Sequence, residues 1–248
     1  MKLWLQALGM CQSMFCAIPS PWQGWEERAR EKMLLCLPLV GLEIGLIWWG
    51  LGELCRYLPP LMAGAVLAGF PWLATGFLHL DGFLDVVDAV RSCRSPEKRR
   101  EILKDSHVGA FAVIGCMLLG LGQFSLCASF GPAPLGLLTM IPVVSRCCAV
   151  LAVNSLRPMQ TSQYAGCEQK KSGRILPGAM LLGTLAAGFG IFGTWGLALL
   201  AEAGCFALAL RRAFRSLGGM NGDISGYCIT LSELSACAAL AAGQLWAG

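Results

Sequence analysis

Charged residues are scarce in this chain. Only 14% of its 248 residues are Asp, Glu, Lys or Arg, and 56% are hydrophobic, whereas soluble domains usually carry about 25% charged residues. This deficit argues against a soluble globular protein. About 20 apolar residues cross a bilayer as a helix, so the chain has room for six or seven spans with short loops. We predict an all-α, polytopic membrane helix bundle in which residues 1–248 form a single integral-membrane domain.

The sequence also has no Cys-x-x-Cys pair, although it contains 13 cysteines. The cysteines are scattered through apolar stretches, as in Leu35-Cys36-Leu37. A disulfide framework or a cysteine metal cluster is therefore not expected, and the thiols should pack as small hydrophobic groups. We expect no cleavable signal peptide. Leu3 to Ile18 is short for a span and follows only Lys2, so we predict an interfacial or re-entrant helix there, with a first transmembrane helix as the alternative.

Long apolar runs set the expected spans. They cover residues 36–56, 60–79, 108–130, 135–155, 177–194, 195–210 and 228–247. The apolar stretch 177–210 is too long for one span, so it is divided at the glycine-rich segment 188–193, where a bend is natural. Seventeen of the 19 Lys and Arg residues lie before the first run or in segments 91–104, 157–174 and 211–215. Seven spans put all four clusters on one side, which the positive-inside rule makes cytoplasmic. We do not expect these clusters to bind nucleic acid.

Aspartate and histidine are rare, with five and two residues in the whole chain. Three of the aspartates, Asp81, Asp85 and Asp88, follow His79 within ten residues. On a helix, their i, i+4, i+7 spacing puts them within about 60° of one another. Three carboxylates on one face repel each other unless a cation lies between them, and Mg²⁺ prefers such hard oxygens and shares its shell with substrate phosphates. The sequence therefore predicts a Mg²⁺ site. A plain helix N-terminus would explain Asp81 but not Asp88, which lies two turns further on.

Three further charged residues are candidates for the site. Lys104 is expected to neutralise phosphate charge, with ordinary topology charge as the alternative. Arg146 is the one basic residue inside an apolar run, so it should face a substrate phosphate or one of the Asp carboxylates. Asp223 is expected to lie just before the last span, at the end of a glycine-rich turn.

Two motifs resemble those of one family, the adenosylcobinamide-GDP ribazoletransferases, also called cobalamin synthases. The family motif His-x-Asp-Gly-x-x-Asp-x-x-Asp is met in full from His79 to Asp88. The motif Arg-Arg-x-x-Ile-Met-Lys-Asp-Ser-x-x-Gly is met from Arg99 to Gly109, with Leu103 in place of Met. Pro-Leu-Val-Gly at 38–41 and the Ser-Arg pair at 145–146 also match. The resemblance covers nearly the whole chain.

The chain departs from the family pattern in three places. The family's early Phe-x-x-Arg-Ile-Pro-x-Pro is one residue shorter at 15–21 and lacks the arginine. Asn221 stands where Thr is usual, and the family's Pro-Tyr-Ala-Arg segment is not recognisable around Tyr164.

The resemblance implies a reaction in which α-ribazole, or its 5′-phosphate, attacks the pyrophosphate of adenosylcobinamide-GDP and GMP leaves. It implies Mg²⁺ as cofactor and a multi-pass protein of the cytoplasmic membrane with its active site on the cytoplasmic side. Asp81, Asp85, Asp88 and Asp223 would hold the metal, and Lys104 and Arg146 would stabilise charge. Asp105 would complete the metal shell or orient the ribazole hydroxyl, and His79 would be a general base or a structural hydrogen-bond donor. The partners would be these small-molecule substrates and the lipid bilayer, and the sequence leaves a homo-oligomer open.

Two other classes fit the acidic run less well. CDP-alcohol phosphotransferases also use an Asp-rich helix, but their pattern needs a fourth Asp where this chain has Ser92. An ion-coupled transporter would place acids in the middle of its spans and repeat its halves, and no internal repeat is seen.

Overall fold

The described part of the chain is helical. The computed structural model describes residues 2–20, 22, 24–159 and 171–243. Within these ranges no strand occurs, and β pairing is limited to an isolated parallel bridge between Pro158 and Met220. The predicted all-α class is therefore confirmed. The chain forms the α-helices α1 (Lys2–Phe15), α2 (Glu27–Met33), α3 (Leu37–Cys55), α4 (Pro60–Ala74), α5 (Leu78–Arg91), α6 (Pro96–Ile102), α7 (Ala110–Ala128), α8 (Ile141–Val153), α9 (Ile175–Phe192), α10 (Leu197–Leu217) and α11 (Gly222–Ala242).

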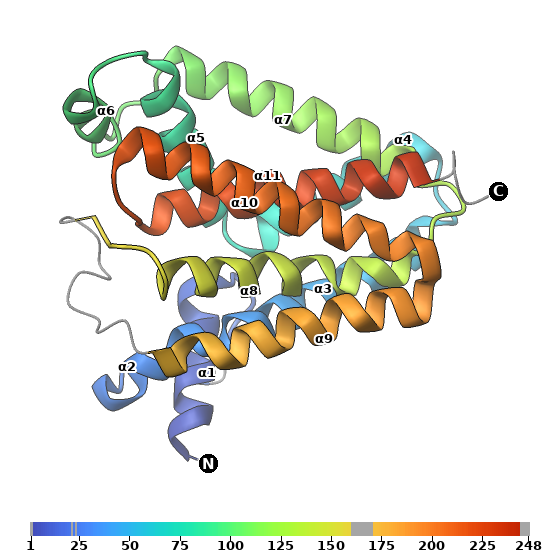
Figure 1. The fold of residues 1–248 in the computed structure, drawn as a ribbon. Helices are drawn as coiled ribbons and strands as arrows, with labels where there is room; N and C mark the ends of the chain where they lie inside the picture. Colours follow the sequence, from blue (N-terminus) through green and yellow to red (C-terminus); the bar gives the residue numbers. More distant parts are fainter. Residues whose placement is uncertain (1, 21, 23, 160–170, 244–248) are drawn as a thin grey trace.

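The long helices form a bundle with two distinct ends. In Figure 1, α3, α7, α8, α9, α10 and α11 run along one common direction. Five helical stretches are long and apolar enough to cross a membrane, or up to six if a bent pair is taken as one span. One of the five is Ile175–Leu217, which contains both α9 and α10. These features support the polytopic membrane bundle expected from composition.

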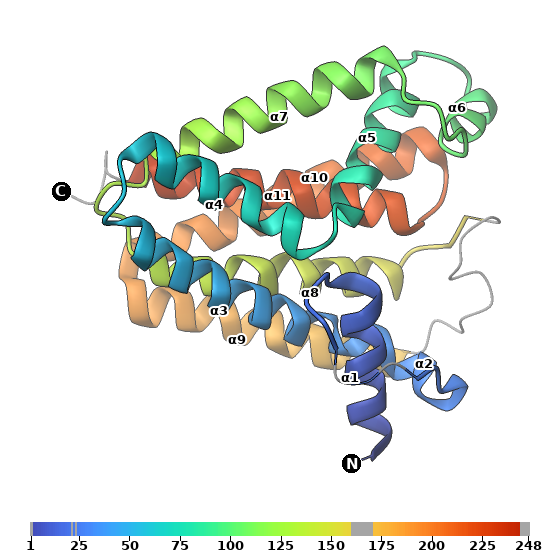
Figure 2. The same ribbon diagram turned by 180° about the vertical axis from the view of Figure 1, so that it is seen from behind.

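The predicted break between the apolar runs 177–194 and 195–210 is confirmed. α9 ends at Phe192, and Gly193 has a positive φ of 58°. A short 3₁₀ turn, Gly193–Gly196, leads into α10, which folds back along the bundle (Figures 1 and 2). Glycine adopts positive φ without the steric cost of a Cβ atom, so the reversal falls at the end of the glycine-rich segment.

The expected span 60–79 is wrong as a single helix. α4 ends at Ala74 and α5 begins at Leu78, with a 90° bend between the two helices. Gly76 and Phe77 both have positive φ, 56° and 64°, and this conformation stops an α-helix. The Phe77 amide donates to the Trp72 carbonyl at 2.8 Å and closes the turn. The apolar composition of the run concealed this break.

Two other boundaries differ from expectation or refine it. α11 starts at Gly222, six residues before the predicted run 228–247, so Asp223 belongs to the first turn of the helix and not to the loop before it. α1 has 14 residues, too few to span a bilayer, and it crosses the direction of the bundle helices (Figure 2). The interfacial position of this helix stays a prediction, and its length argues against the alternative of a full transmembrane span.

The core joins helices that are distant in sequence. Trp48 of α3 is fully buried, and its indole N–H donates to the Leu67 carbonyl of α4 at 3.0 Å. The twelve cysteines in the described part of the chain are free thiols, and most of them are buried. They pack as small hydrophobic groups, as the sequence indicated.

Candidate functional site

The three clustered aspartates lie on one face of α5. The helix forms because Phe83, Val86 and Ala89 recur at helical spacing and are buried against the bundle. Asp81 is exposed on the other side, and Asp85 and Asp88 are half-buried. The predicted common carboxylate face is therefore present, and it extends about 10 Å along the helix at 1.5 Å per residue.

Asp223 joins this face from the far end of the chain. α5 and α11 pack so closely at Gly82 that a Cβ atom there would lie 2.8 Å from the Asp223 carbonyl oxygen. Gly82 is therefore required for the approach of the Asp223 backbone. Asn221 caps α11 by accepting from the Ile224 amide at 3.0 Å, and its side-chain amide donates to the Asp223 carboxylate at 2.6 Å. The glycine-rich turn thus places the Asp223 carboxylate beside the acidic face of α5, and Asn221 fixes its orientation.

The four carboxylates are close enough to interact electrostatically. The negative charges of Asp81, Asp223 and Asp88 all act on Asp85. No described Lys, Arg or His forms an ion pair with any of the four. Repulsion among unneutralised carboxylates favours binding of a cation between them. Their oxygens are the hard donors that Mg²⁺ prefers, so the donor set fits the predicted ion.

The carboxylates do not form a closed metal cage. Among the residues that the structure describes, no three His, Cys, Asp or Glu side chains lie close enough together to hold an ion by themselves. Mg²⁺ typically takes one or two protein carboxylates and completes its octahedral shell with waters and substrate phosphates. An open set of acids is therefore compatible with an ion that is shared with a phosphate ligand.

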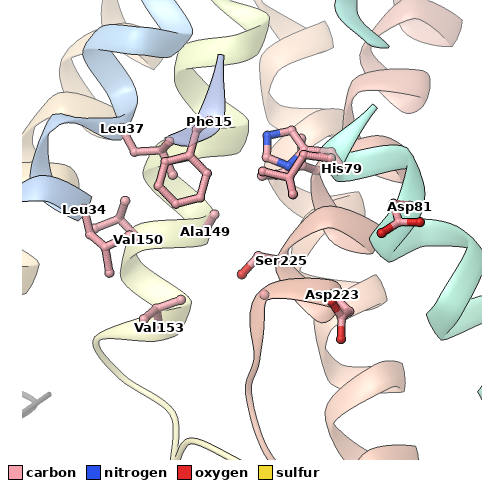
Figure 3. Close-up of a pocket in the computed structure, with 13 residues that line it drawn as sticks. Phe15, Leu34, Leu37, His79, Asp81, Ala149, Val150, Val153, Asp223 and Ser225 are labelled. Carbon is pink, nitrogen blue, oxygen red and sulfur yellow. The ribbon is translucent and has the colours of Figure 1, made fainter. Parts of the chain in front are cut away.

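A small pocket of about 90 Å³ lies beside Asp81 and Asp223. Figure 3 shows these two carboxylates on one side of it and a wall of apolar side chains, including Phe15 and Val150, on the other. His79 also lines this pocket and is 8% exposed. Its Nε2 atom is buried without a hydrogen-bond partner. An unpartnered buried ring nitrogen at a pocket wall is available to a ligand.

Asp88 lies at the other end of the acidic face, against the loop that precedes α7. Its carboxylate contacts Gly109 so closely that a Cβ atom at position 109 would overlap it. Gly109, the glycine that ends the 99–109 motif, thus leaves room for Asp88, the aspartate that ends the 79–88 motif. The two motifs that carry the family resemblance meet at this contact.

Lys104 and Asp105 lie on the surface rather than in the pocket. Lys104 is exposed and lines a separate groove of about 610 Å³ with Arg100 and Arg157. Asp105 accepts from the His107 amide at 3.0 Å and contacts the His107 ring at 2.6 Å. These hydrogen bonds lower the pKa of the Asp105 carboxyl. Asp105 is not among the carboxylates that act on Asp85.

Arg146 does not pair with the aspartates. It is 1% exposed and forms an ion pair with Glu233 of α11. Ser145 joins the pair: Arg146 donates to its hydroxyl at 2.9 Å, and the hydroxyl donates to Glu233 at 2.9 Å. The partner of Arg146 is thus Glu233 rather than the expected Asp, and the sequence gives no sign of this pairing because the two residues lie 87 positions apart.

Comparison with known proteins finds relatives that match nearly the whole chain, including both motifs. A family model described as cobalamin-5-phosphate synthase matches residues 7–241. The chain is 35% identical to an adenosylcobinamide-GDP ribazoletransferase of Clostridium perfringens (strain 13 / Type A), over 95% of this chain and 97% of that relative. It is 34% identical to a protein of the same name from Clostridium botulinum (strain Alaska E43 / Type E3), over 96% and 99%.

A more distant relative extends the pattern. An adenosylcobinamide-GDP ribazoletransferase of Desulfitobacterium hafniense (strain Y51) is 33% identical over 94% of this chain and 93% of its own length. No solved structure matches the chain. A family model that covers nearly the whole sequence, together with full-length relatives, confirms the resemblance seen in the two motifs. The chain belongs to the cobalamin-5-phosphate synthase family.

Proposed function

We propose that the chain transfers the adenosylcobinamide phosphoryl group from adenosylcobinamide-GDP to α-ribazole or its 5′-phosphate. The products are GMP and adenosylcobalamin or its 5′-phosphate. The observation that carries this proposal is the acidic face formed by four aspartates of α5 and α11, two of which, Asp81 and Asp223, line a pocket, in a chain whose relatives bear the name of this reaction. Family membership favours it over a CDP-alcohol phosphotransferase or a transporter.

Asp81, Asp85, Asp88 and Asp223 would hold Mg²⁺ together with the pyrophosphate of the activated cobinamide. When bound, the ion neutralises charge on the transferred phosphoryl group and on the leaving GMP. The protein's own task in phosphoryl transfer is positioning and charge stabilisation. Asn221 contributes to it by orienting the Asp223 carboxylate through their hydrogen bond.

The remaining residues receive roles from their positions. A ribazole hydroxyl forms the new P–O bond, the bond to the bridging oxygen breaks, and the hydroxyl proton must leave. His79 is the candidate acceptor, because its Nε2 atom is buried and unpartnered at the pocket wall.

The other predicted site residues lie outside the pocket. Lys104, with Arg100 beside it in the surface groove, would bind the negatively charged phosphates of the nucleotide. Asp105 would position the loop before α7 through His107. Arg146 would hold α8 against α11 through Glu233.

We further propose that the protein lies in the cytoplasmic membrane with the acidic site facing the cytoplasm. The supporting observation is the distribution of charge between the ends of the bundle. α2, α6, the 3₁₀ turn Lys171–Arg174 that precedes α9, and the end of α10 carry basic residues and lie at one end (Figure 1). The loops at the opposite end, 56–59, 129–134 and 193–196, contain a single basic residue, Arg56. Positive loops are retained on the cytoplasmic side.

The proposed reaction is tested with purified protein reconstituted in phospholipid vesicles. Adenosylcobinamide-GDP, α-ribazole and Mg²⁺ are added, and cobalamin and GMP are quantified by mass spectrometry. We expect equal amounts of both products, and Asp85→Asn or Asp88→Asn should reduce turnover roughly 100-fold or more, the upper range for losing a metal-site group. Glu27→Gln, which neutralises an exposed acid of α2 outside the pocket and the groove, is the matched control. Near-normal turnover by Asp85→Asn would remove its metal role, and no product from the unaltered protein would refute the reaction.

A further inference from the structure

A second depression in the molecule lies on the side of α5 that faces away from the acids. It is a groove of about 600 Å³ between α5, α7 and α11. Phe83, Val86 and Val90 line it from α5, and at 100° per residue they lie roughly opposite the Asp81–Asp88 face. The groove is therefore separate from the site assigned to the reactants.

The groove has an apolar body. Its outer wall is α7, where Phe111, Ile114 and Leu118 are 48%, 53% and 66% exposed. Its inner wall includes Phe83 and Tyr227, whose rings stack with centroids 5.9 Å apart. From Phe111 to Leu119 the wall extends about 12 Å at 1.5 Å per residue. An open apolar channel of this length along membrane helices suits a hydrocarbon chain.

One end of the groove is cationic. Arg91, the last residue of α5, and Arg212, near the end of α10, both line it, and no acidic residue does. Neither arginine forms an ion pair or a side-chain hydrogen bond with any residue in the described ranges. The charges of both arginines act on the Tyr227 phenol, which lines the same groove. Two unneutralised guanidinium groups there suit a phosphate, to which arginine binds through paired N–H donors.

The cationic end and the apolar wall of the groove follow one another along the bundle as the headgroup and the acyl chains of a lipid do in a leaflet. Arg91 ends α5 and Arg212 lies near the end of α10, and Figure 1 shows both helix ends at the basic end of the bundle. The apolar lining residues of α7, from Phe111 to Leu119, follow the start of that helix at the same end. We propose that the groove binds one anionic phospholipid, with its phosphate between Arg91 and Arg212 and an acyl chain between α7 and α11. Each arginine near an anionic headgroup strengthens binding roughly five-fold.

Photo-crosslinking tests this proposal without relying on turnover. The protein is reconstituted in phosphatidylcholine vesicles with a small fraction of phosphatidylglycerol that carries a diazirine in its acyl chain. After irradiation, labelled peptides are mapped by mass spectrometry. We expect labelling of 83–90 and 111–119, and we expect it to exceed labelling by the matched phosphatidylcholine probe.

The double variant Arg91→Gln/Arg212→Gln should lower this preference roughly ten- to thirty-fold, the product of two arginine contacts. Arg94→Gln/Arg211→Gln removes two exposed arginines outside the groove and should leave the preference unchanged. Thermal unfolding in detergent checks that both variants are folded. Equal labelling by the two lipid probes, or an unchanged preference in the folded double variant, would each overturn the proposal.

Discussion

Among single residues, Arg146 shows how burial changes the interpretation of a charge. A lone arginine in an apolar run pointed to a substrate phosphate or an aspartate. The structure pairs it with Glu233, with Ser145 as a third member. A buried charge that loses its partner is expensive, whereas an apolar pair of similar volume is often tolerated. The two possible roles of Arg146, holding helices or touching substrate, can therefore be separated by paired substitutions.

We predict that Arg146→Met destabilises the protein by roughly 3–5 kcal/mol, because it leaves Glu233 buried without its cation. The double variant Arg146→Met/Glu233→Leu should recover most of this loss. The measurement is unfolding of the purified protein in detergent, followed by helical circular dichroism. A stable but inactive double variant would instead show that Arg146 touches the substrate, and unchanged stability in the single variant would contradict the role of the pair.

Gly109 offers a second test at this scale. We predict that Gly109→Ala pushes the Asp88 carboxylate away, because the new Cβ atom would overlap it. Activity at limiting Mg²⁺ should fall roughly 10- to 100-fold, as for loss of an outer-shell partner of a metal ligand, with partial recovery at high Mg²⁺. Gly120→Ala in α7 is the control, because nothing lies within 4 Å of a Cβ atom there. If activity and its Mg²⁺ dependence stay unchanged, Asp88 does not need this position.

At the scale of elements, the bend between α4 and α5 decides where the acids lie. A straight helix through 60–79 would have carried His79 and Asp81 on along the line of α4. The 90° turn at residues 75–77 directs α5 along its own path toward the basic end (Figure 2). Positive φ at Gly76 and Phe77 makes this turn.

We predict that Gly76→Val destabilises the protein by roughly 1–2 kcal/mol, the cost of placing a residue with a Cβ atom in the left-handed region, and more if its branched side chain forces the turn to open. Gly69→Val in α4 is the control, since its side chain would enter open space in a regular helix. Thermal unfolding in detergent measures the difference between the two. Equal melting temperatures would mean that the turn tolerates the substitution.

Local patterns predicted some elements and not others. The spacing of Asp81, Asp85 and Asp88 was sufficient to place them on one helix face, because helix geometry is set by neighbours in sequence. The glycines at 188–193 likewise predicted the α9–α10 reversal. In contrast, the approach of Asp223 to Gly82 and of Glu233 to Arg146 depends on packing of α11 against α5 and α8. These contacts join residues about 90 to 140 positions apart, and one sequence carries no signal for them.

At the scale of the whole molecule, charge divides the bundle into a basic end and an end that is nearly free of cations. This asymmetry could be predicted, because the Lys and Arg residues cluster in a few segments outside the apolar runs. In the proposed orientation, the substrates, which carry nucleotide phosphates, approach the acidic site from the side that holds most of the cations.

Cys93 provides a natural reporter of this orientation, since it is exposed in the segment between α5 and α6. We predict that a membrane-impermeant maleimide labels Cys93 in inverted membrane vesicles but not in intact cells. Tyr57→Cys in a Cys93→Ser background places the thiol at the other end, where Tyr57 is 88% exposed, and should show the reverse pattern. Labelling of Cys93 from outside intact cells would place the acidic site on the opposite side of the membrane.

The starts of α5 and α11 meet at the same pocket, with Asp81 in the first turn of one helix and Asp223 in the first turn of the other. Each helix start carries about half a positive charge from its aligned peptide dipoles. The two partial charges together offset part of the repulsion between the carboxylates before any ion binds. The backbone therefore helps the protein to keep Asp81 and Asp223 side by side at the pocket, and a charged phosphate that enters the pocket meets a field less negative than the side chains alone would produce.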